Sequence, residues 1–292
     1  MKQRSSTITF ILFFIIFTNR SVTFPELTAT PYGLIETDIS YSVSQKNSLD
    51  LYIPQQQKFP VILFIHGGSF VAGDRKDFPY AQIGEAFQKS GIGCAVMSYR
   101  LLQDSVWPAQ PRDAAKAIRW LKDHIADYGG DSDKIYIVGH SAGGQLAALI
   151  CSDSMYVAEF GLSLSDIQGC VSLGAMMSDA GSLQSLTADE EQRLFRNDWF
   201  FKIFGSKQNF VNSLPIRHVN ASMPKMLLIL ADAELYDPPK QQSLLEFMAE
   251  AKKLYASVEY EILPNRTHMG TVEQMVNISD PAIQKIVSFI SK

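Results

Sequence analysis

A serine lies between two glycines in the stretch GHSAG at residues 139–143. The residues just before this stretch are strand formers, and an alanine-rich segment typical of a helix start follows it. A serine hydroxyl is a poor nucleophile at neutral pH unless it is exposed, held in position and paired with a base. A sharp strand-to-helix turn presents a serine in this way, and flanking glycines leave room for the turn. We therefore predict that Ser141 is a nucleophile; the alternative is a tight serine turn without chemistry.

A histidine is the base that could activate this serine, and the chain has five. His268 follows the last predicted strand and comes after Ser141 in chain order, as the base does when the order is serine, acid, histidine. His218 precedes a strand and is the second candidate. We expect the remaining histidines to serve packing, a helix or turn hydrogen bonds: His66, His124 and His140.

Three carboxylates come directly after the apolar run LLILA at residues 227–231 and could orient the histidine. Glu234 is the first choice, because its offset of three residues from Ala231, the small residue ending the strand, places it on the loop. Asp232 is the runner-up acid and lies closer to the sheet, and Asp237 is third. The alternative is that these charges only solvate a loop.

The stretch FIHGGSF at residues 64–70 could supply an oxyanion hole after an earlier strand. Small residues let backbone amides approach a tetrahedral oxyanion, and each such donor contributes about 2.7–4 kcal/mol to transition-state stabilisation. We predict donation by the amides of Gly68 and Ser69. The amide of Ala142 joins them at the positive end of a helix. Taken alone, the two glycines could merely end a strand.

Strand-like and helix-like segments alternate from about residue 33, without an internal repeat or a linker. Continuous apolar strands that alternate with helices indicate a mostly parallel sheet with helices on both faces. Active sites on such sheets form at the carboxyl ends of the strands. We expect one α/β domain over residues 24–292, which opens with an antiparallel pair at 33–43 and 47–54. The other predicted strands cover 60–68, 91–100, 134–140, 166–177, 224–234 and 257–264, and the predicted helices cover 77–91, 111–130, 241–256 and 280–291.

Residues 179–222 interrupt this alternation, first with the charged stretch ADEEQR and then with the aromatic stretch NDWFFKIF. We interpret them as a small cap-like insertion over the active site. Its aromatic residues could line an acyl pocket, for which Phe70, Trp199 and Phe200 are the candidates. Anchoring of the insertion to the core is the alternative role for these rings.

The composition is that of a globular protein with a large core, with 46% hydrophobic and 19% charged residues among 292. A net charge of −4 without a lysine or arginine block argues against nucleic-acid binding and favours a small-molecule partner. The three cysteines lie in apolar segments, so buried free thiols are expected. No motif implies a metal or another cofactor, and no feature indicates an oligomeric state.

The N-terminal segment is typical of an export signal. Lys2 and Arg4 precede an apolar run at residues 8–17, which is shorter than the about 20 residues that cross a bilayer. We therefore expect a signal peptide over residues 1–23 and an exported protein. Contact with a membrane is expected only if this segment stays attached as an anchor.

Several longer stretches resemble one branch of the α/β-hydrolase fold: HGGSFVAGD at 66–74, YRL at 99–101, residues 108–149, SLPIRHV at 213–219 and RTHMG at 266–270. This branch includes hormone-sensitive-lipase-like and feruloyl-esterase-like carboxylesterases, kynurenine formamidases and prenylcysteine methylesterases. The resemblance implies a serine hydrolase acting on a small carboxylic ester. The alternatives are an arylformamidase with the same triad and a noncatalytic binding module. Ala231 and Glu234 depart from the glycine and aspartate of many relatives.

Overall fold

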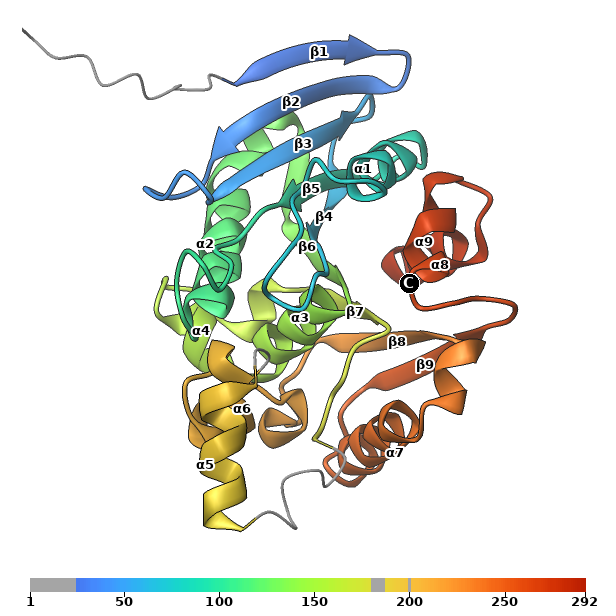
Figure 1. Cartoon of the computed structure of the whole chain (residues 1–292). Coiled ribbons are helices and arrows are strands. Elements are labelled where there is room, and N and C mark those ends of the chain that lie inside the picture. Colours follow the sequence, from blue (N-terminus) through green and yellow to red (C-terminus); the bar gives the residue numbers. More distant parts are fainter. Residues whose placement is uncertain (1–24, 180–186, 199–200) are drawn as a thin grey trace, which may run out of the picture.

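A computed structural model of the chain describes residues 25–179, 187–198 and 201–292 (Figure 1). The predicted signal segment and the predicted pocket residues Trp199 and Phe200 lie outside the described residues. In the described part, no helix has the length and apolar character needed to cross a bilayer.

The described residues form a nine-stranded sheet in the order β1-β2-β3-β5-β4-β6-β7-β8-β9. The strands are β1 (Glu26–Thr30), β2 (Gly33–Ser40), β3 (Ser48–Pro54), β4 (Phe59–Ile65), β5 (Gly93–Met97), β6 (Gly130–His140), β7 (Gly169–Leu173), β8 (Lys225–Ala231) and β9 (Val258–Leu263). The pairs from β1 to β5 are antiparallel, and the pairs from β5 through β4 to β9 are parallel. The predicted mostly parallel sheet and its antiparallel opening pair are therefore confirmed.

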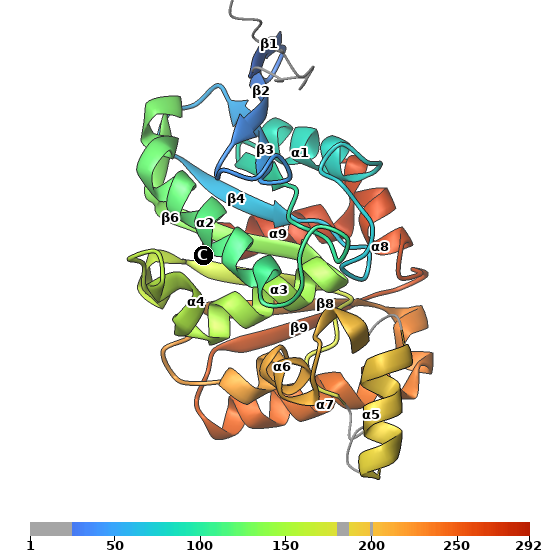
Figure 2. The same ribbon diagram turned by 60° about the vertical axis from the view of Figure 1, so that its left-hand side comes forward.

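Helices cover both faces of the sheet (Figures 1 and 2). One face packs against α1 (Tyr80–Lys89), α8 (Gly270–Glu273) and α9 (Pro281–Ser291). The other packs against α2 (Ala109–His124), α3 (Ala142–Ser152), α4 (Ser154–Ala158) and α7 (Pro238–Lys253). Strands β5 and β7 are buried along their whole length, as expected for parallel strands between two helical layers.

The insertion between β7 and β8 contains α5 (Ala188–Asn197) and α6 (Lys207–Asn212). Its residue Phe204 is buried and packs edge-on against Phe70, with ring centroids 6.0 Å apart. The carbonyl of Ile203 accepts a hydrogen bond of 3.1 Å from the Trp107 amide, and that of Ser213 accepts one of 3.2 Å from the Gln145 side chain. These contacts favour the anchoring role for the insertion's described aromatic residues.

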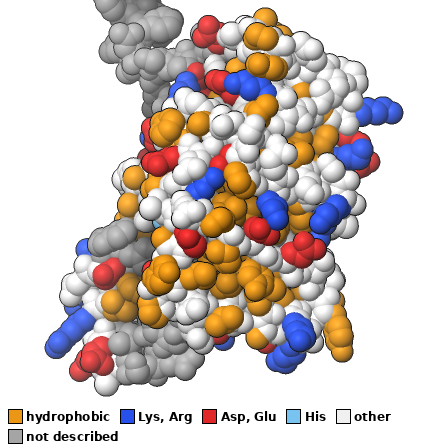
Figure 3. Space-filling model, turned by 90° about the vertical axis from the view of Figure 1, so that its right-hand side faces the viewer, with side chains coloured by type: hydrophobic (Ala, Val, Ile, Leu, Met, Phe, Trp, Pro, Cys, Tyr) orange, Lys and Arg blue, Asp and Glu red, His pale blue; other side chains and the backbone are white. Residues whose placement is uncertain are grey.

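The charges on the face drawn in Figure 3 are mixed. Basic and acidic side chains are interspersed with hydrophobic groups, and no broad basic patch is visible on that face.

Candidate active site

Ser141 occupies the turn between β6 and α3, at the carboxyl end of a central strand. Its backbone has φ 55° and ψ −119°, a conformation that costs energy for any residue with a side chain. A Cβ atom on Gly139 would lie 2.1 Å from the Gly143 carbonyl oxygen, and one on Gly143 would lie 2.2 Å from the Ile65 carbonyl oxygen. The two glycines thus make room for a turn that holds a half-buried serine at the edge of the sheet.

His268 lies in the turn after β9, and its Nδ1 atom is 2.7 Å from Oε1 of Glu234. Glu234 belongs to a short 3-10 helix after β8 and is 4% exposed. Burial alone would raise the pKa of Glu234, but hydrogen bonds from His268, Lys240 and the Ala231 amide outweigh it and lower the pKa to about 2. Because the carboxylate is ionised, the proton in the contact belongs to Nδ1, so the tautomer of the neutral ring is the one with its lone pair on Nε2.

The runner-up residues have other contacts. The carboxylate of Asp232 accepts hydrogen bonds from the amides of Asn265 and Arg266, at 2.7 and 2.9 Å, and so holds the turn that leads to His268. These amides, Arg266 first, lower the pKa of Asp232. His218 lies 2.8 Å from the Asn212 carbonyl oxygen. Of the candidate acids, it is therefore Glu234, the first choice, that the structure brings to His268.

The loop after β4 brings the predicted oxyanion donors to the serine. A Cβ atom on Gly67 would lie 3.1 Å from Cβ of Ser141, so the loop backbone touches the serine turn. Gly68 and Ser69 both have a positive φ, 114° and 52°. Among the described residues, the amides of Gly68, Ser69 and Ala142 have no hydrogen-bond acceptor.

A pocket of about 150 Å³ adjoins the serine. Its lining includes Ser69, Ser141 and Ala142, together with Phe70 from the predicted pocket residues. Gly68 is not part of this lining. The structure has no hydrogen bond between the side chains of Ser141 and His268, both of which lie in the described part of the chain. Lys240 connects the two residues, because it lines the serine's pocket and contacts His268.

A hydrogen-bonded chain that the sequence did not predict joins the loop after β4, which is the predicted oxyanion loop, to the turn after β9 that carries His268. The amide of Gly67 donates to the hydroxyl of Tyr80 at 3.0 Å, and this hydroxyl lies 3.3 Å from Nδ1 of His140. Nε2 of His140 is 3.2 Å from the His268 carbonyl oxygen, which can only accept, so Nε2 carries the proton. Burial, followed by repulsion from His268, lowers the pKa of His140 to about 3 and keeps the ring neutral.

Two more residues near the His268–Glu234 contact were not predicted from the sequence. Gly174 follows β7 with φ 60°, and a Cβ atom there would lie 2.8 Å from Nδ1 of His268 and 2.9 Å from Oε1 of Glu234. Its only sequence signal is a glycine at the end of a strand. Lys240 has no signal in the sequence; its Nζ atom hydrogen-bonds to Glu234 and lies 3.2 Å from Nδ1 of His268.

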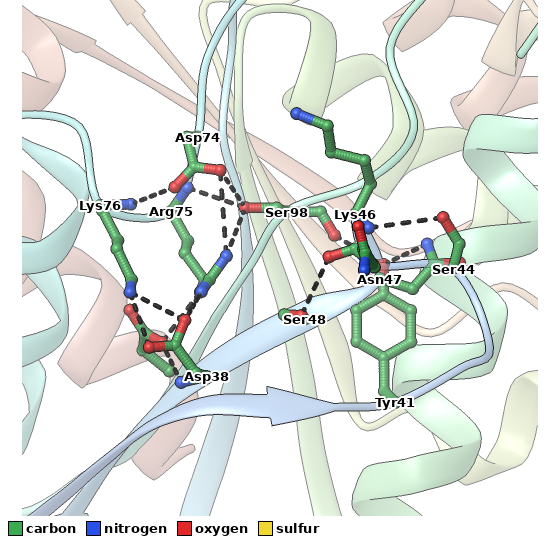
Figure 4. Close-up of polar contacts among 12 residues, drawn as sticks. Asp38, Tyr41, Ser44, Lys46, Asn47, Ser48, Asp74, Arg75, Lys76 and Ser98 are labelled. Atoms are coloured by element: carbon green, nitrogen blue, oxygen red, sulfur yellow. Dashed lines mark hydrogen bonds and ion pairs between the residues drawn. The ribbon is translucent and has the colours of Figure 1, made fainter. Parts of the chain in front are cut away.

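Ion pairs anchor the far end of the oxyanion loop, as Figure 4 shows. The guanidinium of Arg75 bonds to Asp50 at 2.8 Å and also to Asp38, which places the loop against β2 and β3. The Arg75 amide and the Asp74 carboxylate both bond to the Ser98 hydroxyl, at 3.1 and 2.9 Å. The loop that carries the amides is therefore fixed at three separate points.

No group of three histidine, cysteine or acidic residues in the described ranges could hold a metal ion. The three cysteines are buried and free, as predicted.

Comparison with known proteins gives a match between residues 49–248 and the model of the BD-FAE family. The matched part includes Ser141 and Glu234 and ends before His268. One similar protein is a probable isoprenylcysteine alpha-carbonyl methylesterase of Arabidopsis thaliana, 25% identical over 250 residues, which are 82% of this chain and 51% of the relative. Another is the probable carboxylic ester hydrolase LipM of Mycobacterium tuberculosis, 25% identical over 79% of this chain and 55% of its own. The chain thus spans about half the length of these relatives.

Solved structures of esterases share the fold. A truncated carbohydrate esterase from gut microbiota aligns with a TM-score of 0.71 and 20% identity, over 89% of this chain and 96% of its own. Esterase B from Lactobacillus rhamnosis aligns with a TM-score of 0.68 and 23% identity, over 88% and 84% of the two chains. With the sheet order described above, these alignments confirm the predicted α/β-hydrolase fold.

Proposed function

The chain belongs to the BD-FAE family, and from this we propose that it is a serine-dependent hydrolase of small carboxylic esters. The names of its relatives and of the similar solved structures support ester hydrolysis. The observation that carries the proposal is the 2.7 Å contact between His268 Nδ1 and Glu234, at the same sheet edge as the strained Ser141 turn. A pocket of about 150 Å³ beside Ser141 suits a small substrate.

In the proposed reaction, Ser141 Oγ attacks the ester carbonyl carbon while His268 Nε2 takes the proton of the Ser141 hydroxyl. Glu234 stabilises the imidazolium that forms, and it can do so because its pKa of about 2 keeps it ionised. The amides of Ser69, Gly68 and Ala142 would donate to the oxyanion. His268 then gives the proton to the departing alcohol, and an acyl group remains on Ser141.

Deacylation repeats these steps with water. His268 takes a proton from a water molecule, the hydroxide attacks the acyl carbon, and the proton returns to Ser141 as the carboxylic acid leaves. Neither step uses a metal or an organic cofactor.

The test compares the wild-type chain with Ser141→Ala on p-nitrophenyl acetate and butyrate. We expect the substitution to lower kcat by at least about 10³-fold, because it removes the nucleophile. Ser222→Ala, at an exposed serine far along the chain, serves as the matched control. A fluorophosphonate probe should label the wild type and the control but not Ser141→Ala. Full activity of Ser141→Ala would refute the proposal, and labelling without ester turnover would favour an aryl formamide substrate.

A further inference from the structure

We propose that Lys240 is a specificity-determining residue and that it makes the site prefer esters that carry a carboxylate group. This inference rests on the proposed ester hydrolysis and adds the class of substrate.

The surroundings of Lys240 favour binding of an anion next to its ammonium group. It is the third residue of α7, close to the positive end of the helix dipole, where a cation is disfavoured. Its side chain is only 19% exposed, and its Nζ atom bonds to the buried carboxylate of Glu234. Among the described residues that line the pocket beside Ser141, Lys240 is the only charged one. An ammonium group has three donors, so Lys240 can bond to Glu234 and still bind an acceptor in the pocket.

The contact between Lys240 and His268 brings two donors together. Because Nδ1 of His268 carries a proton for Glu234, it cannot accept a hydrogen bond from Nζ, which is 3.2 Å away. The two groups share one carboxylate. When His268 takes the proton of Ser141, its ring becomes a cation beside the ammonium, and the like charges repel.

A carboxylate on the substrate would remove this penalty. Bound to Lys240 in the pocket, it would supply a second negative charge for the two cations. The gain would appear in the transition state, when the imidazolium forms, and therefore as a faster reaction of such esters. A neutral ester of the same shape would leave the repulsion in place.

The experiment uses substrates that differ only in charge. Monomethyl glutarate and the methyl ester of glutaramic acid place a carboxylate or a neutral amide on the acyl side. On the alcohol side, the 3-acetoxybenzoate anion carries a carboxylate and 3-acetoxybenzamide carries a neutral amide. We expect the wild-type chain to show at least a tenfold higher kcat/KM for the charged member of one pair, and that pair identifies the side that faces Lys240.

Variants at position 240 assign the preference. Lys240→Met should abolish the preference, measured as the ratio of kcat/KM for the charged and the neutral ester within the same variant, and Lys240→Arg should keep this ratio. Lys253→Met, at the exposed far end of the same helix, should behave as the wild type. Equal rates on both members of both pairs, or a preference that survives in Lys240→Met, would overturn the inference.

Two further measurements keep the test decisive. Free glutarate should inhibit the unmodified chain at least tenfold more strongly than neutral glutaramide, a comparison that needs no substitution; equal inhibition would count against the inference. Turnover of p-nitrophenyl acetate separates the two proposals. Its absence would refute ester hydrolysis, whereas turnover without a charge preference would refute only the role of Lys240.

Discussion

The carboxylate of Glu234 serves three donors at once. Oε1 faces His268 and Lys240, while Oε2 accepts a hydrogen bond of 2.9 Å from the amide of Ala231, three residues earlier. The bond back to Ala231 fixes the carboxylate at the end of β8. An aspartate at position 234 would be one methylene shorter and could not span the same contacts without a backbone shift. The geometry thus explains why a glutamate at this position reaches both His268 and the Ala231 amide.

Removing the charge of Glu234 tests its assignment as the acid. We expect Glu234→Gln to lower kcat on p-nitrophenyl acetate by about 10³–10⁴-fold, since the imidazolium loses its carboxylate and the histidine its orienting acceptor. Asp232→Asn should lower kcat less than about tenfold, because Asp232 bonds to turn amides and not to His268. Equal losses in the two variants, measured with the folded state verified by circular dichroism, would show that the acid is misassigned.

His140 predicts a pH dependence of stability. Its folded-state pKa, about 3, lies below the about 6.5 of an unfolded histidine. The unfolded chain therefore binds a proton more readily between these values. The contribution of His140 is fully present above pH 6.5 and falls by about 1.4 kcal/mol per pH unit as the pH drops toward 3.

Urea unfolding at pH 7, 6 and 5 measures this effect. Relative to the wild type, His140→Gln should lose less free energy of unfolding on going from pH 7 to 5, because it has no imidazole to protonate. His124→Gln, at an exposed histidine of α2, should follow the wild-type slope. If the free energy of unfolding of His140→Gln changed with pH as it does in the wild type, a buried neutral imidazole at position 140 would be ruled out.

At the scale of elements, the loop between β4 and α1 connects the proposed oxyanion donors to the N-terminal strands. Arg75 is 8% exposed and pairs with Asp50, which is 3% exposed, while Lys76 is 51% exposed and pairs with Asp38. Buried and exposed ion pairs therefore lie next to each other in one loop. Breaking a buried pair leaves an uncompensated charge, whereas an exposed pair contributes little.

This difference gives a matched pair of substitutions. We expect Arg75→Met to lower the free energy of unfolding by about 3–5 kcal/mol, because Asp50 stays buried without its partner. Lys76→Met should lower it by less than about 1 kcal/mol. Urea unfolding measures both values, and p-nitrophenyl acetate turnover of the folded Arg75→Met protein should also fall as the loop loses its anchor. Similar losses in the two variants would contradict this account of the loop.

Most of the elements that the sequence predicted contribute buried residues to the core. On α2, apolar residues that recur at helical spacing, among them Ala114, Ile118 and Leu121, are fully buried. The continuous apolar runs of the parallel strands also predicted these strands from the sequence. Strand β1 was missed because it is a short edge strand with mostly exposed residues, so it carries no hydrophobic pattern. The polar helix α5 was recognised only as part of an insertion for the same reason.

At the scale of the whole molecule, the chemistry depends on contacts between distant segments. The proposed catalytic residues Ser141, Glu234 and His268 follow separate strands. Chain order and turn chemistry made them the first choices from the sequence, with Asp232 and His218 as the runners-up. Tyr80 and Lys240 lie on helices, and nothing in their local sequence indicates a partner 60 or 28 residues away. Such contacts depend on how helices pack against the sheet, which a pattern along the chain does not encode.

The two hydrophobic cores, one on each face of the sheet, can be followed through the cysteines. Cys94 of β5 lies in the core that α1 and α9 cover, whereas Cys151 of α3 and Cys170 of β7 lie in the core of the opposite face. Burial raises the pKa of Cys94, and burial followed by contact with Cys170 raises that of Cys151. Native thiols should therefore not react with a chromogenic disulfide reagent within minutes at pH 8, whereas all three should react in urea.

Because both cores share one sheet, variants that each keep a single cysteine should become reactive at the same urea concentration. A clearly lower midpoint for Cys94 would mean that the face covered by α1 and α9 opens before the other, and that the sheet does not unfold as one unit.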